Sequence, residues 1–289
     1  MAGDSIDLDI TLDRETRLVL LTQGSTKIFK SPGRDVKSRQ AMNITVGPGA
    51  GLCYLPDPVQ PFKASSMGQH QIYEVGVERR EGDSAIKHGS LCALDWVCEG
   101  RRARGENWRI WGYESRNEVW LTQPGASQEE AGKRRLLLRD NLMLEDELRR
   151  REDVSNGLVS SDSELVSDFA SRMDSLGVFG TLILHGPLFR ELGKFFMQEF
   201  NLLPRIGGRK WDTGDDKPVL DSQEAARKVR QQQETADGLL WTVSNLRSCT
   251  VVKFGAKEVE GGKRWLRHML ETEGSVPSHF GERALLCLK

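Results

Sequence analysis

Short stretches in which apolar and polar residues alternate occupy most of the first half of the chain. Residues 6–12 read IDLDITL, with an apolar side chain at every second position. A strand places alternate side chains on opposite faces, so this stretch is expected to be a strand with one solvent-facing side. The pattern, with its Gly- and Pro-containing turns, predicts a mainly β fold of extended, many-stranded architecture. Further strands are expected at residues 17–23, 41–46, 70–77, 91–97, 107–113, 118–122 and 135–144.

The second half of the chain mixes helices with strands. Seven of the eight residues 145–152 are charged and residues 153–163 are polar, which favours a short helix followed by a loop. The first later helix carries an apolar stripe that either packs on the β layer or binds a partner protein: Leu188, Leu192, Phe195, Phe196 and Phe200. Helices are expected at 187–201, 223–235 and 257–271, strands at 239–243 and 249–254, and a loop at 206–221.

Composition argues against several classes of protein. The 41 basic and 42 acidic residues give a net charge of -1, without the basic excess that nucleic-acid binding needs. The five cysteines form no C-x-x-C pair, which argues against a disulfide framework or a structural zinc site. The acidic start of the chain does not resemble a signal peptide, and no apolar run approaches membrane-spanning length. We therefore expect a cytoplasmic protein that binds neither nucleic acid nor membranes.

The common catalytic motifs are missing from the sequence. It contains no phosphate-binding P-loop, no H-E-x-x-H, no G-x-S-x-G and no G-x-G-x-x-G, and its five histidines are scattered. Cys92 and Cys98 are six residues apart on one expected strand, so both thiols should lie on the same face as small buried groups.

Two stretches hold charged residues at fixed positions. LPDPVQPFKAS at 55–65 contains three prolines, which make it stiff and extended. LDWVCEGRRARGENW at 94–108 places acids and arginines beside two tryptophans, a combination that is costly to bury unless the charges pair. The second stretch is either a salt-bridged surface hairpin or a partly buried polar path or interface.

The same stretches resemble the urease accessory protein D family, UreD, which is called UreH in some bacteria. The similarity runs in order over nearly the whole chain, and its loops around 126–133 and 145–165 look fungal or eukaryotic. Family members usually carry several dozen residues before the AGD motif, which stands here at residues 2–4, so this chain is expected to be N-terminally shortened. The matching words are AGDSIDLDI at 2–10, LTQGSTKIFKS at 21–31, LPDPVQPFKASSMGQ at 55–69, LDWVCEGRRARGENW at 94–108, RLLLRDNLML at 135–144, LPRIGGR at 203–209 and VVKF at 251–254.

The resemblance implies a maturation factor that is not an enzyme. Its expected fold is one β-rich domain with a helix-like winding of strands and a few helices: β-rich 1–144, a charged insert at 145–165 and a mixed part at 166–289. It is expected to act as a scaffold or chaperone for nickel insertion into apo-urease. The implied partners are apo-urease and the UreF-type and UreG-type accessory proteins, of which the UreG type is a GTPase. Ni²⁺ would pass transiently through an internal path, with no cofactor permanently bound.

The acidic residues in the segments that resemble the family are the candidates for a nickel path, and nearby basic residues could pair with them. Because a carrier must release its ion, binding is expected to be micromolar at best and through oxygen ligands. The candidate path acids are Asp4, Asp7, Asp57, Asp95 and Glu106, and the candidate supporting residues are Lys27, Lys63, Arg101 and Arg104.

Two alternatives to nickel insertion remain open. The first is a β-rich hydrolase in which Asp57 or Asp95 acts with Glu106, which would need two carboxylates about 5–10 Å apart in a cleft. The second is a protein-interaction module without a metal role.

Overall fold

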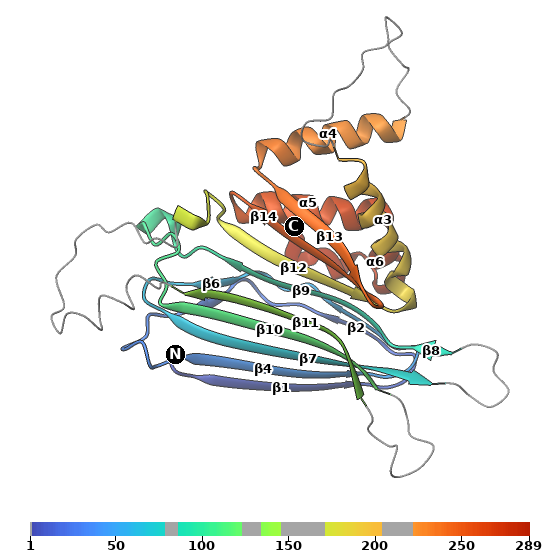
Figure 1. The fold of residues 1–289 in the computed structure, drawn as a ribbon, viewed down its shortest axis with the longest axis horizontal. Coiled ribbons are helices and arrows are strands. Elements are labelled where there is room, and N and C mark those ends of the chain that lie inside the picture. The colour runs from blue at the N-terminus through green and yellow to red at the C-terminus, as the bar shows by residue number, and fades with distance from the viewer. Residues whose placement is uncertain (1, 79–85, 123–133, 146–170, 204–221) are drawn as a thin grey trace, which may run out of the picture.

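The structure is a computed structural model that describes residues 2–78, 86–122, 134–145, 171–203 and 222–289. Two β-sheets packed face to face form the body of the molecule, and helices cover the outer side of one sheet (Figure 1). The mainly β prediction is therefore confirmed, with fourteen strands among the described residues.

The first sheet, sheet A, is built largely from the first half of the chain. Its strands follow the order β1 (Ser5–Leu12), β4 (Ser38–Val46), β7 (Ser66–Glu78), β10 (Gly112–Thr122) and β11 (Arg134–Glu145), and β8 (Lys87–His88) pairs with β7.

The second sheet, sheet B, lies between sheet A and the helices. Its strands follow the order β13 (Leu240–Leu246), β14 (Cys249–Ala256), β12 (Val178–His185), β9 (Ser90–Cys98), β5 (Gly51–Tyr54) and β2 (Arg17–Leu20). Two short strands, β3 (Thr26–Ile28) and β6 (Val59–Pro61), pair with each other, and β6 also pairs with β9.

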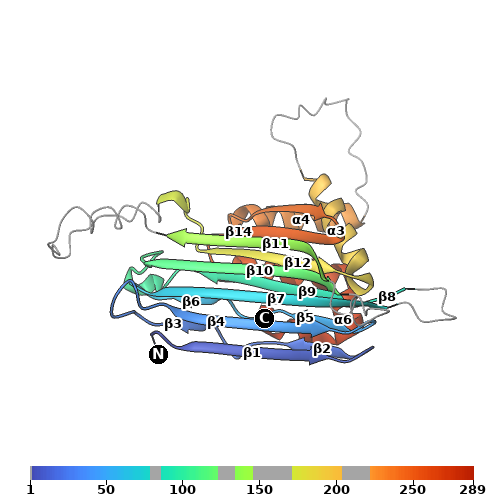
Figure 2. The same cartoon turned by 60° about the horizontal axis from the view of Figure 1, so that its bottom comes forward.

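The chain winds between the two sheets in its first half (Figure 2). β1, β4, β7 and β10 pair in parallel in sheet A, and β2, β5 and β9 pair in parallel in sheet B. Successive passes therefore stack like turns of a flattened helix, as the resemblance implies. The later strands β11, β12, β13 and β14 pair antiparallel with their neighbours.

Two apolar layers hold this arrangement together. One lies between the sheets and includes Ile44 and Tyr73 from sheet A and Leu52 from sheet B. The other lies between sheet B and the helices and includes Cys92 and Cys98, which share one face as expected. β9 is buried at all nine positions because both of its faces are covered.

Among the described residues, four α-helices lie on the outer side of sheet B (Figure 1). They are α3 (Arg190–Asn201), which follows a 3-10 turn at Pro187–Phe189, α4 (Ser222–Ala236), α5 (Val259–Glu273) and α6 (Ser275–Phe280). No helix in the described ranges is long and apolar enough to cross a membrane.

The apolar stripe of α3 and its preceding turn packs inside the molecule. Leu192 and Phe196 are fully buried in the core between sheet B and the helices. Leu188, Phe195 and Phe200 are partly buried and pack against the same core. Of the two alternatives for this stripe, packing on the β layer is the contact that the structure shows.

One expected strand, at 107–113, is wrong. The chain forms a 3-10 turn at Arg102–Arg104 and an irregular segment, and β10 begins only at Gly112. The backbone at Trp108 has a φ of 49°, which a strand cannot contain, and the Trp108 Nε1 donates a hydrogen bond to the Leu176 carbonyl at 2.7 Å. Glu145, the expected start of a helix over 145–152, is the last residue of β11, and the rest of that helix and the loop expected at 206–221 lie outside the described residues.

Candidate functional site

Polar side chains cross the interior of the two-sheet body from strand to strand. In sheet A, Gln69 lies opposite both Gln40 and Ser115, and Asn117 lies opposite both Gln71 and Asp140. These positions share the inward parity of the apolar residues that form the core between the sheets. We call these six residues, together with Asp95 of sheet B and Asp57 of the segment between β5 and β6, the polar row.

Asp95 is the centre of the polar row. It projects from β9 and accepts hydrogen bonds from Gln69 Nε2 at 3.1 Å, Ser115 Oγ at 2.5 Å and Asn117 Nδ2 at 2.6 Å. Its carboxylate thus connects sheet B with two strands of sheet A. Burial raises the pKa of Asp95, and the nearby charge of Asp140 raises it further, while the three hydrogen bonds act in the opposite direction.

A small cavity of about 40 Å³ lies beside Asp95. Asp57 also lines it, so the structure brings two of the candidate path acids to one place. The space can hold water but is far below the roughly 300–1,000 Å³ of a small-molecule site. Its other lining residues are Thr22, Thr26, Gln40, Tyr54, Pro56, Val59, Gln69, Gln71, Leu94 and Trp96.

Asp57 marks one end of this polar interior. Its carboxylate pairs with Lys263 Nζ of α5 at 2.8 Å and accepts a hydrogen bond from the Gly24 backbone at 3.1 Å. Its backbone N–H donates to Thr22 Oγ1, while Cys287 Sγ donates to the Thr22 carbonyl. Residues from both ends of the sequence therefore surround Asp57.

Asp140 marks the other end of the row. It pairs with Lys253 Nζ of β14 at 2.6 Å and accepts a hydrogen bond from Thr181 Oγ1 at 3.3 Å. Sequence reasoning did not single out Asp140. The sequence does place Asp140 between Leu138 and Leu142, and the alternation of side chains along β11 puts all three on its inward face.

Glu106 has a separate environment. It forms a two-pronged ion pair with Arg101, whose Nε lies 2.9 Å from Oε2, and Arg101 in turn covers the Phe62 ring at 4.1 Å. The hydrogen bond from Arg101 lowers the pKa of Glu106, although partial burial acts against this. Glu106 does not line the cavity beside Asp95.

The remaining candidates lie on the surface. Asp4 and Asp7 are exposed at β1 and Lys27 is exposed on β3. Lys63 and Arg104 are also exposed. None of these five side chains lines the cavity beside Asp95. Across the described residues, no three His, Cys, Asp or Glu side chains form a group that could hold a metal ion.

The five thiols should be unreactive in the folded protein. All five cysteines are buried, and burial raises the pKa of Cys98 and of Cys249 to about 12. Because the thiolate is the reactive species, we expect a thiol reagent such as Ellman's reagent to label none of them until denaturant is added. Rapid labelling of the native protein at neutral pH would contradict this assignment.

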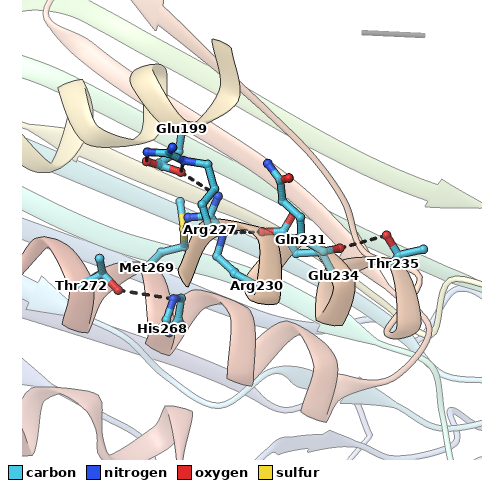
Figure 3. A network of polar contacts seen from close by, with 9 residues as sticks. All are labelled: Glu199, Arg227, Arg230, Gln231, Glu234, Thr235, His268, Met269 and Thr272. Atoms are coloured by element: carbon cyan, nitrogen blue, oxygen red, sulfur yellow. Dashed lines mark hydrogen bonds and ion pairs between the residues drawn. The ribbon is translucent and has the colours of Figure 1, made fainter. Parts of the chain in front are cut away.

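A second group of charges lies among the helices, outside the polar row (Figure 3). The buried Arg230 of α4 pairs with Glu199 of α3 at 2.7 Å and with Glu234 at 2.9 Å. Arg227 also pairs with Glu199 at 2.9 Å. Burial raises the pKa of Glu199, but the bonds with Arg227 and Arg230 outweigh it, so the net shift is downward. This network connects α4 to α3 and has the geometry of a structural contact.

Comparison with known proteins assigns the fold a family. The sequence matches the model of the UreD urease accessory protein family over residues 1–285. It is 27% identical over 285 residues to a Schizosaccharomyces pombe protein described as an uncharacterized urease accessory protein ureD-like, covering 98% of this chain and 81% of the relative. Urease accessory protein 4 of Cryptococcus neoformans is 27% identical over 305 residues, covering 98% and 77%. Urease accessory protein D of Arabidopsis thaliana is 33% identical over 121 residues, covering 42% and 37%.

These matches, with the wound β fold and its polar interior, define the class as urease accessory proteins. Within that class, the chain belongs to the UreD family. Membership supports a role in urease maturation and implies interaction with urease and with other accessory proteins. The family names also suggest a maturation factor that is not catalytic.

Proposed function

We propose that this protein is a scaffold for nickel insertion into apo-urease and that Ni²⁺ crosses it along the polar row. The observation that carries the proposal is a series of three acids through the molecule. Asp57 and Asp95 line one cavity, and Asn117 connects Asp95 to the neighbouring Asp140. The ion would come from a UreG-type GTPase, in a cytoplasmic complex that also contains a UreF-type protein.

The chemistry of the polar row suits an ion in transit. Carboxylate, amide and hydroxyl oxygens bind Ni²⁺ more weakly than sets of His or Cys ligands do, so the ion can move on. Gln71 Nε2 and Asn117 Oδ1 have no hydrogen-bond partner among the described residues, and buried groups of this kind are commonly hydrated. Water molecules would complete the coordination of a passing ion. We expect nickel affinity in the micromolar range at best.

Each end of the row carries a lysine that a divalent cation would have to displace. Lys263 pairs with Asp57 and Lys253 pairs with Asp140, so both terminal carboxylates are neutralised while the path is empty of cations. A cation that carries two charges competes with a single ammonium group for each carboxylate. Passage is therefore favoured for a divalent ion over a monovalent one.

The test removes the charge of the path acids without changing their shape. We expect Asp57→Asn and Asp95→Asn each to lower nickel-dependent urease activation by about tenfold, equivalent to about 1.4 kcal/mol, while folding and co-purification with the partner proteins persist. Glu106→Gln is the matched control, because its carboxylate lies outside the cavity. Full activation by both Asp variants would leave a pure interaction module as the better account.

The hydrolase alternative has less support. Asp57 and Asp95 do line one cavity, but its volume of about 40 Å³ leaves no room for an ester or glycoside substrate. Glu106, the proposed second carboxylate, is already paired with Arg101. Multiple-turnover hydrolysis that disappears in Asp95→Asn would restore this alternative.

A further inference from the structure

A second and larger cavity, of about 430 Å³, lies where β12 ends and α3 begins. Its walls come from the end of β12, the turn between β13 and β14, the start of α3, and parts of β8, β10 and β11. The volume falls in the range of small-molecule sites. It shares no lining residue with the cavity beside Asp95.

The walls of this cavity are strongly basic. Arg135, Arg190, Lys194 and Arg247 line it, and none of its described lining residues is acidic. Among the described residues, Arg135 and Arg190 make no ion pair, whereas Lys194 pairs with Glu191 at 2.7 Å. In a chain with a net charge of -1, this local excess of positive charge attracts an anion.

Arg247 is held at the cavity by the turn between β13 and β14. Its backbone φ is 57°, in the left-handed region, and its guanidinium donates a hydrogen bond to the Leu136 carbonyl. The same turn presents the Ser248 carbonyl to His185, a buried residue that also lines the cavity.

His185 restricts which anions fit the cavity, a restriction that positive charge alone does not impose. The side chain is 5% exposed, and its Nδ1 lies 3.0 Å from the Ser248 carbonyl oxygen. A carbonyl can only accept, so Nδ1 carries the hydrogen. Burial lowers the pKa of His185 and nearby His88 lowers it further, while the Ser248 hydrogen bond acts in the opposite direction, so the net shift favours the neutral ring. Nε2 then carries no hydrogen and presents a lone pair. It is buried and has no hydrogen-bond partner among the described residues.

We propose that this cavity binds a phosphate group that retains a P–OH hydrogen, with the arginines neutralising its charge and His185 Nε2 accepting its hydrogen bond. Inorganic phosphate carries both negative charge and an O–H group at neutral pH. Sulfate and carboxylates carry the charge without the hydrogen, so they would leave the Nε2 lone pair facing another acceptor. The site thus selects for hydrogen-bearing phosphate over anions that lack the hydrogen.

The test compares anions of similar size on the full chain by titration calorimetry at neutral pH. Inorganic phosphate should bind at least about tenfold more tightly than sulfate, since one hydrogen bond to a charged partner is worth about that factor. Adenosine monophosphate identifies the source of the phosphate group when it is compared with inorganic phosphate at about pH 5.5, because a phosphate monoester loses its remaining P–OH hydrogen near pH 6. Tighter binding than inorganic phosphate assigns the rest of the cavity to an organic group, and weaker binding assigns the site to the free anion.

Three variants separate the two parts of the site. His185→Gln should abolish the preference for phosphate over sulfate, and Arg190→Gln should weaken both anions about tenfold. Arg283→Gln removes an equal charge from an exposed position outside the cavity and should change neither. Thermal melting identifies a variant that fails to fold. If His185→Gln does not fold, binding of the two anions is measured instead on His88→Gln, a change at another lining residue of the cavity.

Two results would overturn the proposal. One is equal binding of phosphate and sulfate by the wild-type protein, or binding of neither. The other is uptake of Ni²⁺ at this cavity that disappears in His185→Gln while phosphate has no effect, because Nε2 would then be a metal ligand.

Discussion

Asp95→Ala should lower the free energy of unfolding by about 2–4 kcal/mol. The substitution removes the acceptor shared by Gln69, Ser115 and Asn117 and leaves three buried donors unpaired, each costing about 1–3 kcal/mol. Release of a buried carboxylate from its desolvation cost offsets part of this loss. Urea denaturation of the wild-type and variant proteins measures the difference directly. An unchanged midpoint would show that the Asp95 contacts between the sheets add nothing to stability.

The pH dependence of Asp95→Asn provides an independent reading of the same group. The folded-state pKa of Asp95 is raised, chiefly by burial, so the folded protein holds a proton there in a range where the unfolded chain has lost it. Wild type should therefore gain stability relative to Asp95→Asn as the pH falls through the raised pKa. The gain should be complete below the ordinary aspartate value of about 4. A stability difference that stays constant with pH would contradict the buried environment assigned to this carboxyl.

Arg230→Ala should destabilise the protein by about 3–5 kcal/mol, the cost of removing one member of a buried ionic group. Arg230 is the contact between Glu199 of α3 and Glu234 of α4, and all three side chains are less than a tenth exposed. Without it, Glu234 remains buried with no cationic partner among the described residues. Its pKa is already raised by burial, so it would take up a proton rather than stay charged.

Lys228→Ala is the matched control for this variant. Lys228 lies on the same helix and pairs with Glu224 at 3.7 Å, but both side chains are about half exposed. An exposed pair of this kind is worth about 0–1 kcal/mol. Equal midpoints in urea for the two variants would rule out a special role for the buried network.

The alternation and turn signals predict the mainly β body because they are local, whereas the winding of its strands is implied only by the family resemblance. The alternation at 6–12 needs no partner to be recognised, and β1 forms there as expected. β9 was recognised as an apolar stretch, but its burial on both faces depends on helices that come much later in the chain. The short strands β3, β5 and β6 have too few residues to show a period, and their pairing is set by neighbours in the stack.

The sequence predicted the candidate site only in part, for a related reason. Asp57 and Asp95 both belong to segments that resemble the family, and the fold places both at one cavity. Glu106 belongs to the same segment as Asp95, but its partner Arg101 is only five residues away and the two side chains form a local ion pair. Asp140 was missed because its importance depends on register, which places it opposite Asn117 across two strands. Spacing along the chain cannot supply such a cross-strand relation.

The surroundings of Asp57 have a consequence for the newly made protein. Thr22 and Asp57 are synthesised early, whereas Lys263 and Cys287, which complete the wall around them, lie 206 and 265 positions later than their respective partners. A ribosome adds roughly 5–20 residues per second, so many seconds pass between synthesis of the early strands and formation of these late contacts. During that interval the Asp57 carboxylate has no lysine beside it. Until Lys263 has been made, the Asp57 carboxylate is therefore open to any cation, and the ammonium group that competes for it in the proposed nickel path is added only by the later part of the chain.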